Sequence, residues 1–326
     1  MTGAKRVTGA PRKTDVERRN NVERFLTGYR IGHATDLERR TGCTVLLPPA
    51  GTIAAVDVRG GAPGTRETGV FTPGNLVSEI DALLFTGGSA FGLAAATGVM
   101  AWLRRAGAGF QVGPVRVPIV AAAVLFDLGV GDPRAFPDDA MGEAACSAAV
   151  EGPIETGRVG AGTGATAGKL HGIARSAPGG LGICRLTLPG GEEVAALAVA
   201  NPFGDVVDAM TGQLLAAPSR PRGGHVRSAD ALWREPVPDR ACAGANTTLV
   251  CVATTVPFEA GSLRRVAIEA HDGIARAVRP AHTVVDGDVV FALAPGGTAP
   301  PVPLRLQVGA AAAEAAARAI SSAVAP

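Results

Sequence analysis

The sequence predicts a layered α/β fold in which strands and helices alternate along the chain and some neighbouring strands form hairpins. Hydrophobic residues make up 47% of the 326 residues, but aromatic residues make up only 4%. This balance is typical of a core built mainly from Ala, Val, Leu and Ile. A chain of this length can bury a large core, and we expect one domain over residues 28–326.

The first 27 residues are rich in Lys and Arg and contain little that could be buried. Such a composition predicts a disordered basic tail over residues 1–27. After it, two short β-rich runs at residues 43–47 and 52–58 are separated by a Pro-Pro-Ala-Gly turn. Their spacing predicts a hairpin or a closely spaced pair of strands.

Buried strands are predicted at residues 83–86 and 119–125. The first is followed by a helix over residues 90–105, whose small side chains favour close packing. A second helix is predicted over residues 138–150, with acidic residues in its first turn. These segments extend the alternation of strand and helix.

Two sequence motifs resemble known sites, but each lacks a residue that the site requires. The glycine-rich run ending at Lys169 has Leu170 where a phosphate-binding loop needs Ser or Thr. The segment around Ser89 lacks the final glycine of a nucleophile elbow. We therefore expect neither nucleotide binding nor a serine nucleophile at these positions.

The second half of the chain has its own hairpin and alternating elements. Strands at residues 183–188 and 194–199 flank a Pro-Gly-Gly turn, and the second strand ends near Asn201. A long connection rich in Pro, Gly and Arg then leads to Asn246. The elements predicted after it are strand 248–254, helix 262–278 with Ser262 as N-cap, strand 289–293 and an Ala-rich helix near 306–323.

Charge and cysteine usage exclude several function classes. The net charge is only +2 and the basic residues are scattered, which gives no reason to expect nucleic acid or a membrane surface as partner. The five cysteines are far apart, and the five histidines sit singly, so we expect no metal and no cofactor. No apolar leader or membrane-spanning run is evident, and we expect a cytoplasmic protein.

The stretch around Asn246 and Thr247 indicates a specific chemistry. A β-rich run begins abruptly at Thr247, so a cut after Asn246 would make Thr247 the first residue of a new chain. Its free α-amine, with a pKa of about 7.7 to 8.0, would then be a base beside its own hydroxyl nucleophile. The alternative is that Asn-Thr-Thr is an ordinary turn entering a buried strand.

The ordered landmarks resemble the family of autoprocessing amidohydrolases that contains the DmpA-type and β-peptidyl aminopeptidases and the endo-type nylon-oligomer hydrolases. They are Gly-Gly-Ser-Ala-Phe-Gly-Leu at 87–93, the glycine-rich run to Lys169, Asn201-Pro202, Asn246-Thr247-Thr248, and Asp286-Gly-Asp288. The resemblance implies a four-layer αββα fold of the N-terminal-nucleophile hydrolase type. It also implies self-cleavage into residues 1–246 and 247–326, a small peptide or oligoamide substrate, and a homo-oligomer, a tetramer in this family.

Five residues of this sequence match functional positions of that family. Thr247 looks like the nucleophile, and Asn201 like the amide donor that stabilises the oxyanion. Lys169, Asp286 and Asp288 match a lysine and an acidic pair that would orient the hydroxyl and the amine and set their protonation. Taken singly, each also has an ordinary explanation as a loop charge or a turn former.

The sequence also departs from the family pattern. Phe126 replaces a tyrosine of the aminopeptidase members, so a hydroxyl contact from that position is absent. Thr247 and the acidic pair are closer to the nylon-oligomer type. Two alternatives remain: a non-catalytic scaffold or small-molecule binder with the same fold, and an acyltransferase, whose signature residues are not found here. The sequence does not distinguish α-peptide, β-peptide and oligoamide substrates, or exo from endo action.

Overall fold

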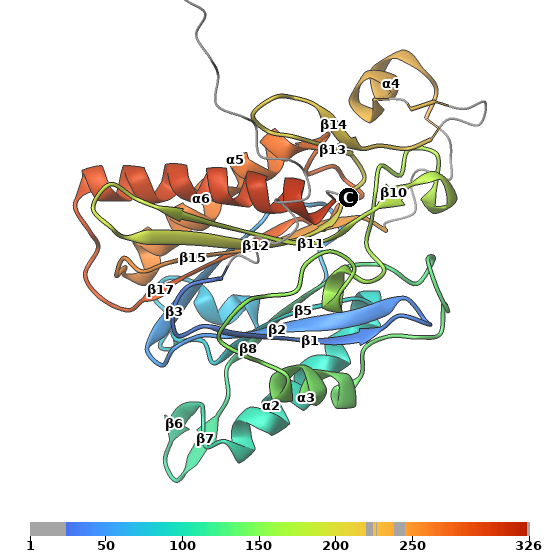
Figure 1. Ribbon diagram of the computed structural model, residues 1–326. Coiled ribbons are helices and arrows are strands. Elements are labelled where there is room, and N and C mark those ends of the chain that lie inside the picture. Colours follow the sequence, from blue (N-terminus) through green and yellow to red (C-terminus); the bar gives the residue numbers. More distant parts are fainter. Residues whose placement is uncertain (1–23, 220–223, 226, 238–244, 325–326) are drawn as a thin grey trace, which may run out of the picture.

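The computed structural model describes residues 24–219, 224–225, 227–237 and 245–324. Within these residues the main elements form four layers, with two helices, two packed sheets and two further helices in that order (Figure 1). The predicted four-layer αββα fold is therefore confirmed.

The sheet that carries the candidate site has the strand order β11-β12-β15-β17-β3. Its pairs are antiparallel except for β15 with β17, which are parallel. Helices α5 and α6 cover its outer face (Figure 1). The bounds are β3 (Thr52–Val58), β11 (Gly180–Thr187), β12 (Glu193–Asn201), β15 (Thr247–Thr254), β17 (Val289–Pro295), α5 (Ala260–Ala277) and α6 (Val302–Ala323).

The second sheet has the order β1-β2-β5-β8-β4, and helices α2 and α3 cover it (Figure 1). The N-cap of α3 is Asp138, which accepts a hydrogen bond from the backbone N–H of Met141 (3.0 Å) and explains why the helix starts there. The bounds are β1 (Arg30–Asp36), β2 (Thr41–Leu47), β4 (Thr65–Arg66), β5 (Ala82–Thr86), β8 (Val120–Val124), α2 (Ala95–Arg105) and α3 (Asp139–Ser147).

Short elements connect and flank the four layers. The short strands are β6 (Phe110–Val112), β7 (Val115–Val117), β9 (Thr166–Ala167), β10 (Ala177–Pro178), β13 (Asp205–Val207), β14 (Leu214–Ala216) and β16 (Val278–Arg279). The short helices are η1 (Thr68–Phe71), η2 (Ser89–Ala94), η3 (Gly160–Gly162), η4 (Ile173–Arg175) and α4 (Ser228–Arg234). Helix α4 belongs to the long connection that precedes the candidate site.

Each interface between layers has its own apolar core. Leu197, Leu249 and Phe291 are fully or almost fully buried between the two sheets. Alternate residues of the same strands, such as Val250, point to the opposite face and pack with Ile274 of α5. Strands buried on both faces explain why the sequence reads as continuous apolar runs.

Helices α2 and α3 approach each other closely because both carry a glycine at their contact. A Cβ atom built on Gly98 would lie 1.8 Å from the carbonyl oxygen of Asp139, and one on Gly142 would lie 1.9 Å from that of Ala95. Neither position has room for a side chain. The close packing that the small residues predict is confirmed.

Some predicted details are wrong. Strands β2 and β3 do not form a hairpin: β2 pairs with β1 and β5, whereas β3 pairs with β17 in the other sheet. The turn between them carries the chain from one sheet to the next. Strand β1 was not predicted, although its pairing with β2 is the hairpin of this region.

Other boundaries differ by a few residues. The predicted helix 90–105 begins as the 3₁₀ helix η2 before it becomes α2. Helix α5 starts at Ala260, so Ser262 is not its N-cap; the Ser262 hydroxyl instead donates to Glu259 (2.9 Å). Of the predicted tail, residues 1–23 lie outside the described part, but Phe25 and Leu26 are buried, so the packed chain begins before Gly28.

Across the described part of the chain, every helix is too short or too polar to cross a lipid bilayer. Among the same residues, no cluster of three or more His, Cys, Asp or Glu side chains is arranged to hold a metal ion.

Candidate active site

Strand pairing brings Asn201 and Thr247 together. Asn201 is the last residue of β12 and Thr247 the first of β15, and the antiparallel register sets them opposite each other. The pairing continues inward through Val199 and Leu249, which are completely buried. The two polar residues therefore mark the end of a rigid, apolar strand pair.

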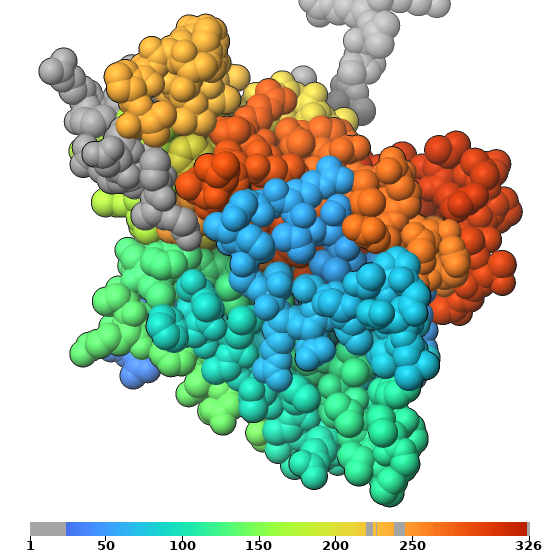
Figure 2. Space-filling view, turned by 180° about the vertical axis from the view of Figure 1, so that it is seen from behind, coloured from blue at the N-terminus to red at the C-terminus, as the bar shows by residue number. Residues whose placement is uncertain are grey.

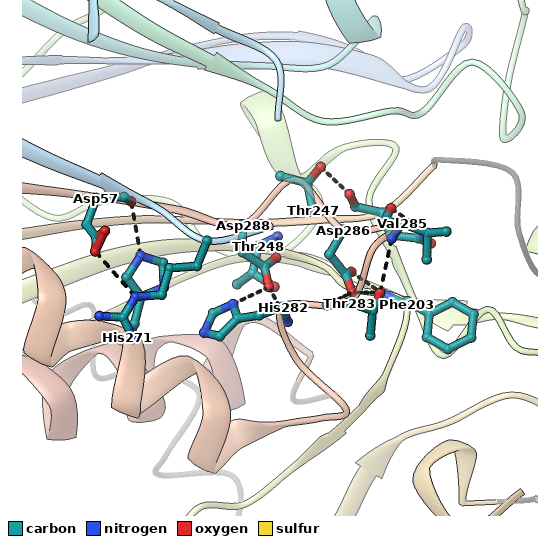
Figure 3. Close-up of polar contacts among 12 residues, drawn as sticks. Asp57, Phe203, Thr247, Thr248, His271, His282, Thr283, Val285, Asp286 and Asp288 are labelled. Atoms are coloured by element: carbon teal, nitrogen blue, oxygen red, sulfur yellow. Dashed lines mark hydrogen bonds and ion pairs between the residues drawn. The ribbon is translucent and has the colours of Figure 1, made fainter. Parts of the chain in front are cut away.

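The bond between Asn246 and Thr247 is held by polar contacts on both sides. The Thr247 hydroxyl donates to the carbonyl oxygen of Asn246 (2.5 Å). That same oxygen accepts a hydrogen bond from the backbone N–H of Gly287 (2.8 Å). The side-chain amide of Asn246 donates to the carbonyl oxygen of Val285 (3.1 Å), so the segment after β16 aligns the peptide bond (Figure 3).

Lys169 is a buried cation that faces three oxygen atoms. Its Nζ donates to the backbone oxygen of Asn201 (2.7 Å), to the Asn201 side-chain oxygen (2.9 Å) and to the backbone oxygen of Ala245 (2.9 Å). Burial lowers the pKa of Lys169 to about 7, although Asp286 and Asp288 act in the opposite direction. Lys169 is therefore poised to change charge near neutral pH.

The Asn201 side chain is fully engaged. Its oxygen also accepts from the backbone N–H of Thr166 (2.9 Å). Its nitrogen donates to the backbone oxygens of Ala245 (3.2 Å) and, at a longer distance, Phe126 (3.4 Å). This amide thus contacts the residue before Asn246, while the Asn246 carbonyl oxygen accepts from the Thr247 hydroxyl and the Gly287 N–H.

Asp286 is held on both oxygens. One accepts from the backbone N–H of Phe203 (3.0 Å), and the other from the backbone N–H (3.1 Å) and the hydroxyl of Thr283. Burial and the neighbouring charge of Asp288 raise the pKa of Asp286 to about 6. The Asp286 carboxyl therefore stays protonated to a higher pH than an ordinary aspartic acid does.

Asp288 connects the start of β15 to a histidine. One of its oxygens accepts from the backbone N–H of Thr248 (2.6 Å). The other accepts from the backbone N–H of His282 (2.9 Å) and lies 2.8 Å from its Nδ1 (Figure 3). The carboxylate thus fixes the backbone directly after Thr247.

The structure brings all five predicted catalytic residues and Asn246 into one buried cluster. Lys169 and Asp288 contact the backbone of Ala245 and Thr248, on either side of the Asn246–Thr247 bond. The Asp286 carboxylate instead contacts Phe203 and Thr283. Sequence reasoning missed His282, Thr283 and Gly287. A hydroxyl residue three positions before Asp286 was a signal for Thr283, whereas the roles of Gly287 and His282 depend on tertiary contacts.

The four-layer αββα arrangement, in which a hydroxyl residue begins the middle strand of one sheet beside a buried amide and a buried amine, is a fold of the N-terminal-nucleophile hydrolase type. The model of peptidase family S58 matches residues 26–326. The chain belongs to this family and is an amide-bond hydrolase.

Relatives with related names support this assignment. The chain is 42% identical to an uncharacterized aminopeptidase of Mycobacterium tuberculosis over 91% of both chains. It is 34% identical to a 6-aminohexanoate-oligomer endohydrolase of Paenarthrobacter ureafaciens, over 82% of this chain and 72% of the relative.

Among solved structures, the fold matches the L-aminopeptidase D-Ala-esterase/amidase of Ochrobactrum anthropi with a TM-score of 0.71 at 20% identity, covering 91% of this chain and 84% of that one. It also matches a β-aminopeptidase of Burkholderia sp. with a TM-score of 0.66 at 24% identity, over the same shares of the two chains. At these identities the likeness concerns the fold.

Proposed function

We propose that this protein is made as one inactive chain, cuts itself between Asn246 and Thr247, and then hydrolyses amides with Thr247 as its nucleophile. The observation that carries the proposal is the Thr247 hydroxyl lying 2.5 Å from the carbonyl oxygen of the peptide bond to be cut. This contact occurs where a buried strand begins, at a site closed to solvent in the uncut chain.

Self-cleavage needs no outside reactant except water. The Thr247 oxygen attacks the Asn246 carbonyl carbon, the bond from that carbon to the Thr247 nitrogen breaks, and the hydroxyl proton ends on that nitrogen. The product is an ester between Asn246 and the Thr247 side chain. Water hydrolyses the ester and leaves the Asn246 carboxylate, a free hydroxyl and a free α-amine on Thr247.

In turnover, the new α-amine is the base that activates the hydroxyl. The hydroxyl attacks a substrate amide, the amine product leaves, and water releases the acyl group. Once Ala245 and Asn246 have moved away, the Asn201 nitrogen is free to donate to the oxyanion. Lys169, Asp286 and Asp288 set the charge of this cluster, and Lys169 and Asp288 also hold the backbone on either side of the Asn246–Thr247 bond.

The substrate class follows from the named relatives. One relative is named an uncharacterized aminopeptidase and another a 6-aminohexanoate-oligomer endohydrolase, and both names describe the cleavage of amide bonds. We therefore propose a small peptide or an oligoamide as substrate. A homo-oligomeric state and a cytoplasmic location remain predictions from the sequence.

The direct test is the mass of the purified protein. Wild type should appear as two fragments, residues 1–246 and 247–326, and Thr247→Ala should stay folded, uncut and inactive because it lacks the hydroxyl. Thr247→Ser keeps the hydroxyl and should be cut at least in part. A cut Thr247→Ala chain would exclude Thr247 as the nucleophile, and an uncut folded wild type would favour a non-catalytic scaffold.

The neighbouring threonine offers a matched control. The Thr248 hydroxyl is buried and has no hydrogen-bond partner, while its backbone N–H holds Asp288. Thr248→Val removes the hydroxyl, keeps the shape and the N–H, and should leave self-cleavage intact. If Thr248→Val abolished the cut in a folded protein, the loss in Thr247→Ala could not be assigned to its own hydroxyl.

A further inference from the structure

The carbonyl oxygen of Asn246 receives two donors that differ in kind. One is the hydroxyl of Thr247 (2.5 Å), which has to leave this contact in order to attack the carbonyl carbon. The other is the backbone N–H of Gly287 (2.8 Å), which plays no part in the bond changes and can stay. A fixed N–H donor on the oxygen of a reacting carbonyl is the element that stabilises a developing oxyanion.

The segment that carries Gly287 is fixed by neighbouring backbone. The carbonyl oxygen of Asp286 accepts from the N–H of Ala62 (2.8 Å), and that of Asp288 accepts from Arg59 (3.1 Å) and Gly60 (3.2 Å). A Cβ on Gly60 would lie 2.3 Å from the Asp286 oxygen, so a glycine is needed for this approach. In the view from behind, blue atoms around residue 60 lie against orange atoms of the C-terminal part (Figure 2).

Gly287 also leaves space for the nucleophile. A Cβ atom built on Gly287 would lie 2.9 Å from the Thr247 hydroxyl oxygen and 2.8 Å from the carbonyl oxygen of Ala62. Any other residue would crowd the hydroxyl before it could reach the carbonyl carbon. The N–H donor and the free space are thus supplied by one residue, on the side of the peptide bond where the attack takes place.

The Asn201 amide is engaged elsewhere at this stage. Its nitrogen donates to the carbonyl oxygen of Ala245, one residue before the bond to be cut, and to that of Phe126. We infer that the backbone N–H of Gly287 is the oxyanion donor of self-cleavage, and that Asn201 takes this role only in turnover, after Ala245 has left. The inference rests on the proposed self-cleavage at Thr247.

In this step the pair of electrons of the Asn246 C=O bond moves onto the oxygen as the Thr247 oxygen bonds to carbon. The negative oxygen keeps its hydrogen bond to Gly287 and loses that from Thr247, whose proton passes to the departing nitrogen. When the C–N bond breaks, the electron pair returns and the carbonyl re-forms as an ester. The Gly287 N–H is unchanged at the end, as required of a catalytic group.

The sharpest test replaces the amide between Asp286 and Gly287 with an ester, so that residue 287 is glycolic acid and has no N–H. The chain can be joined by chemical ligation at Cys251, refolded, and followed by intact mass. Loss of one oxyanion donor should slow the appearance of fragments 1–246 and 247–326 by about 100- to 1000-fold.

The matched control makes the same replacement at Gly297, whose N–H donates to the carbonyl oxygen of Phe258 (2.9 Å) away from the site. It should slow cutting by less than about tenfold, the scale of one ordinary hydrogen bond. Equal cutting rates for the two refolded ester proteins, with equal melting temperatures, would overturn the inference.

A second variant tests the free space that Gly287 leaves for the nucleophile. Gly287→Ala retains the N–H but places a methyl group against the Thr247 hydroxyl, and should accumulate as uncut, folded chain. Gly69→Ala is its control, because a Cβ there meets nothing within 4 Å. Cutting of Gly287→Ala at the wild-type rate would contradict the need for this space, whereas the N–H donor, which the variant keeps, is tested by the pair of ester proteins.

Thr247→Ala, measured in parallel, distinguishes a failure of the Gly287 inference from a failure of the proposed function. If wild type is cut, Thr247→Ala is not, and the Gly287 ester protein is cut as fast as the Gly297 ester protein, the proposed function stands and the oxyanion role of the Gly287 N–H is wrong. If Thr247→Ala is cut or wild type is not, the proposed function itself fails.

Discussion

At the scale of single residues, Lys169 connects most of the site. Its ammonium contacts both oxygens of Asn201 and the oxygen of Ala245, while Asp286 and Asp288 raise its pKa from a distance. A buried charge of this kind is stable only when its partners are all in place. Replacing one partner should therefore affect folding as well as catalysis.

In Asn201→Ala we expect both a loss of turnover and a loss of stability. Loss of an oxyanion donor should lower the turnover of matured protein by about 100- to 1000-fold. Because Lys169 and the Thr166 N–H also lose an acceptor, the free energy of unfolding should fall by about 1 to 3 kcal/mol. Amide hydrolysis and thermal denaturation measure the two effects, and full turnover in matured Asn201→Ala would exclude the role.

The carboxylates give the site its pH dependence. Burial and Asp288 raise the pKa of Asp286 to about 6, so the activity that needs its carboxylate should rise with pH through this value. In Asp286→Asn this acid limb should be displaced or the rate should collapse. Asp288→Asn should also lose rate, because its single amide oxygen cannot replace the two carboxylate oxygens that accept from the N–H groups of Thr248 and His282. Unchanged pH–rate profiles in both variants would leave Asp286-Gly-Asp288 as an ordinary turn.

The same shift affects stability. Since the folded state binds the Asp286 proton more tightly than the unfolded state, its contribution to stability is present at low pH and is lost as pH rises from 3.8 to about 6. Asp286→Asn does not titrate. Its melting temperature relative to wild type should therefore increase over this pH range and then level off, which differential scanning calorimetry can follow.

The candidate site residues could be predicted only through the resemblance to a known family, because each of them, taken singly, also has an ordinary explanation as a loop charge or a turn former. Asn201 and Thr247 mark strand ends, and Asp286-Gly-Asp288 precedes a buried strand. The role of Gly287 could not be read in the same way. It depends on which backbone oxygen its N–H meets and on the position of Thr247, and both are set by tertiary packing.

At the scale of elements, the α2–α3 contact depends on glycine. A methyl group at Gly98 or Gly142 would overlap a carbonyl oxygen of the opposite helix. Gly98→Ala and Gly142→Ala should each lower the free energy of unfolding by about 1 to 3 kcal/mol, as overpacking does.

Self-cleavage of the folded fraction should stay normal in these variants, because this helix layer is separated from the site by a sheet. Thr97→Ala, at an exposed position of α2, is the control and should leave the melting temperature almost unchanged. A melting temperature equal to that of wild type in both glycine variants would show that the helices can separate without loss.

Strand pairing was predicted less well than strand position. The segments of β2 and β3 were located correctly, but their short Pro-Gly connection indicated a hairpin, whereas the chain passes from one sheet to the other. Pro and Gly favour a reversal of chain direction whether the next strand joins the same sheet or the other sheet. The sequence does not show which neighbours complete each sheet, since β3 pairs with β17 from the far end of the chain.

At the scale of the molecule, the proposed cut does not divide the fold into two bodies. Strand β15 of the fragment 247–326 pairs with β12 of the fragment 1–246, and α6 packs on β11 and β12. Both contacts are buried and apolar. The two fragments should therefore elute together in size-exclusion chromatography and in native mass spectrometry, and separate only under denaturing conditions.

The sheet register described above also makes the proposed cut a permanent record of folding. Asn201 and Thr247 lie opposite each other only when β12 and β15 are paired in their native alignment, and a slip of one strand by one residue would turn its side chain to the opposite face. A chain with a wrong alignment would keep its peptide bond. The cut fraction of a preparation would then measure how many molecules had formed the native sheet at least once. It would do so even for molecules that had unfolded afterwards.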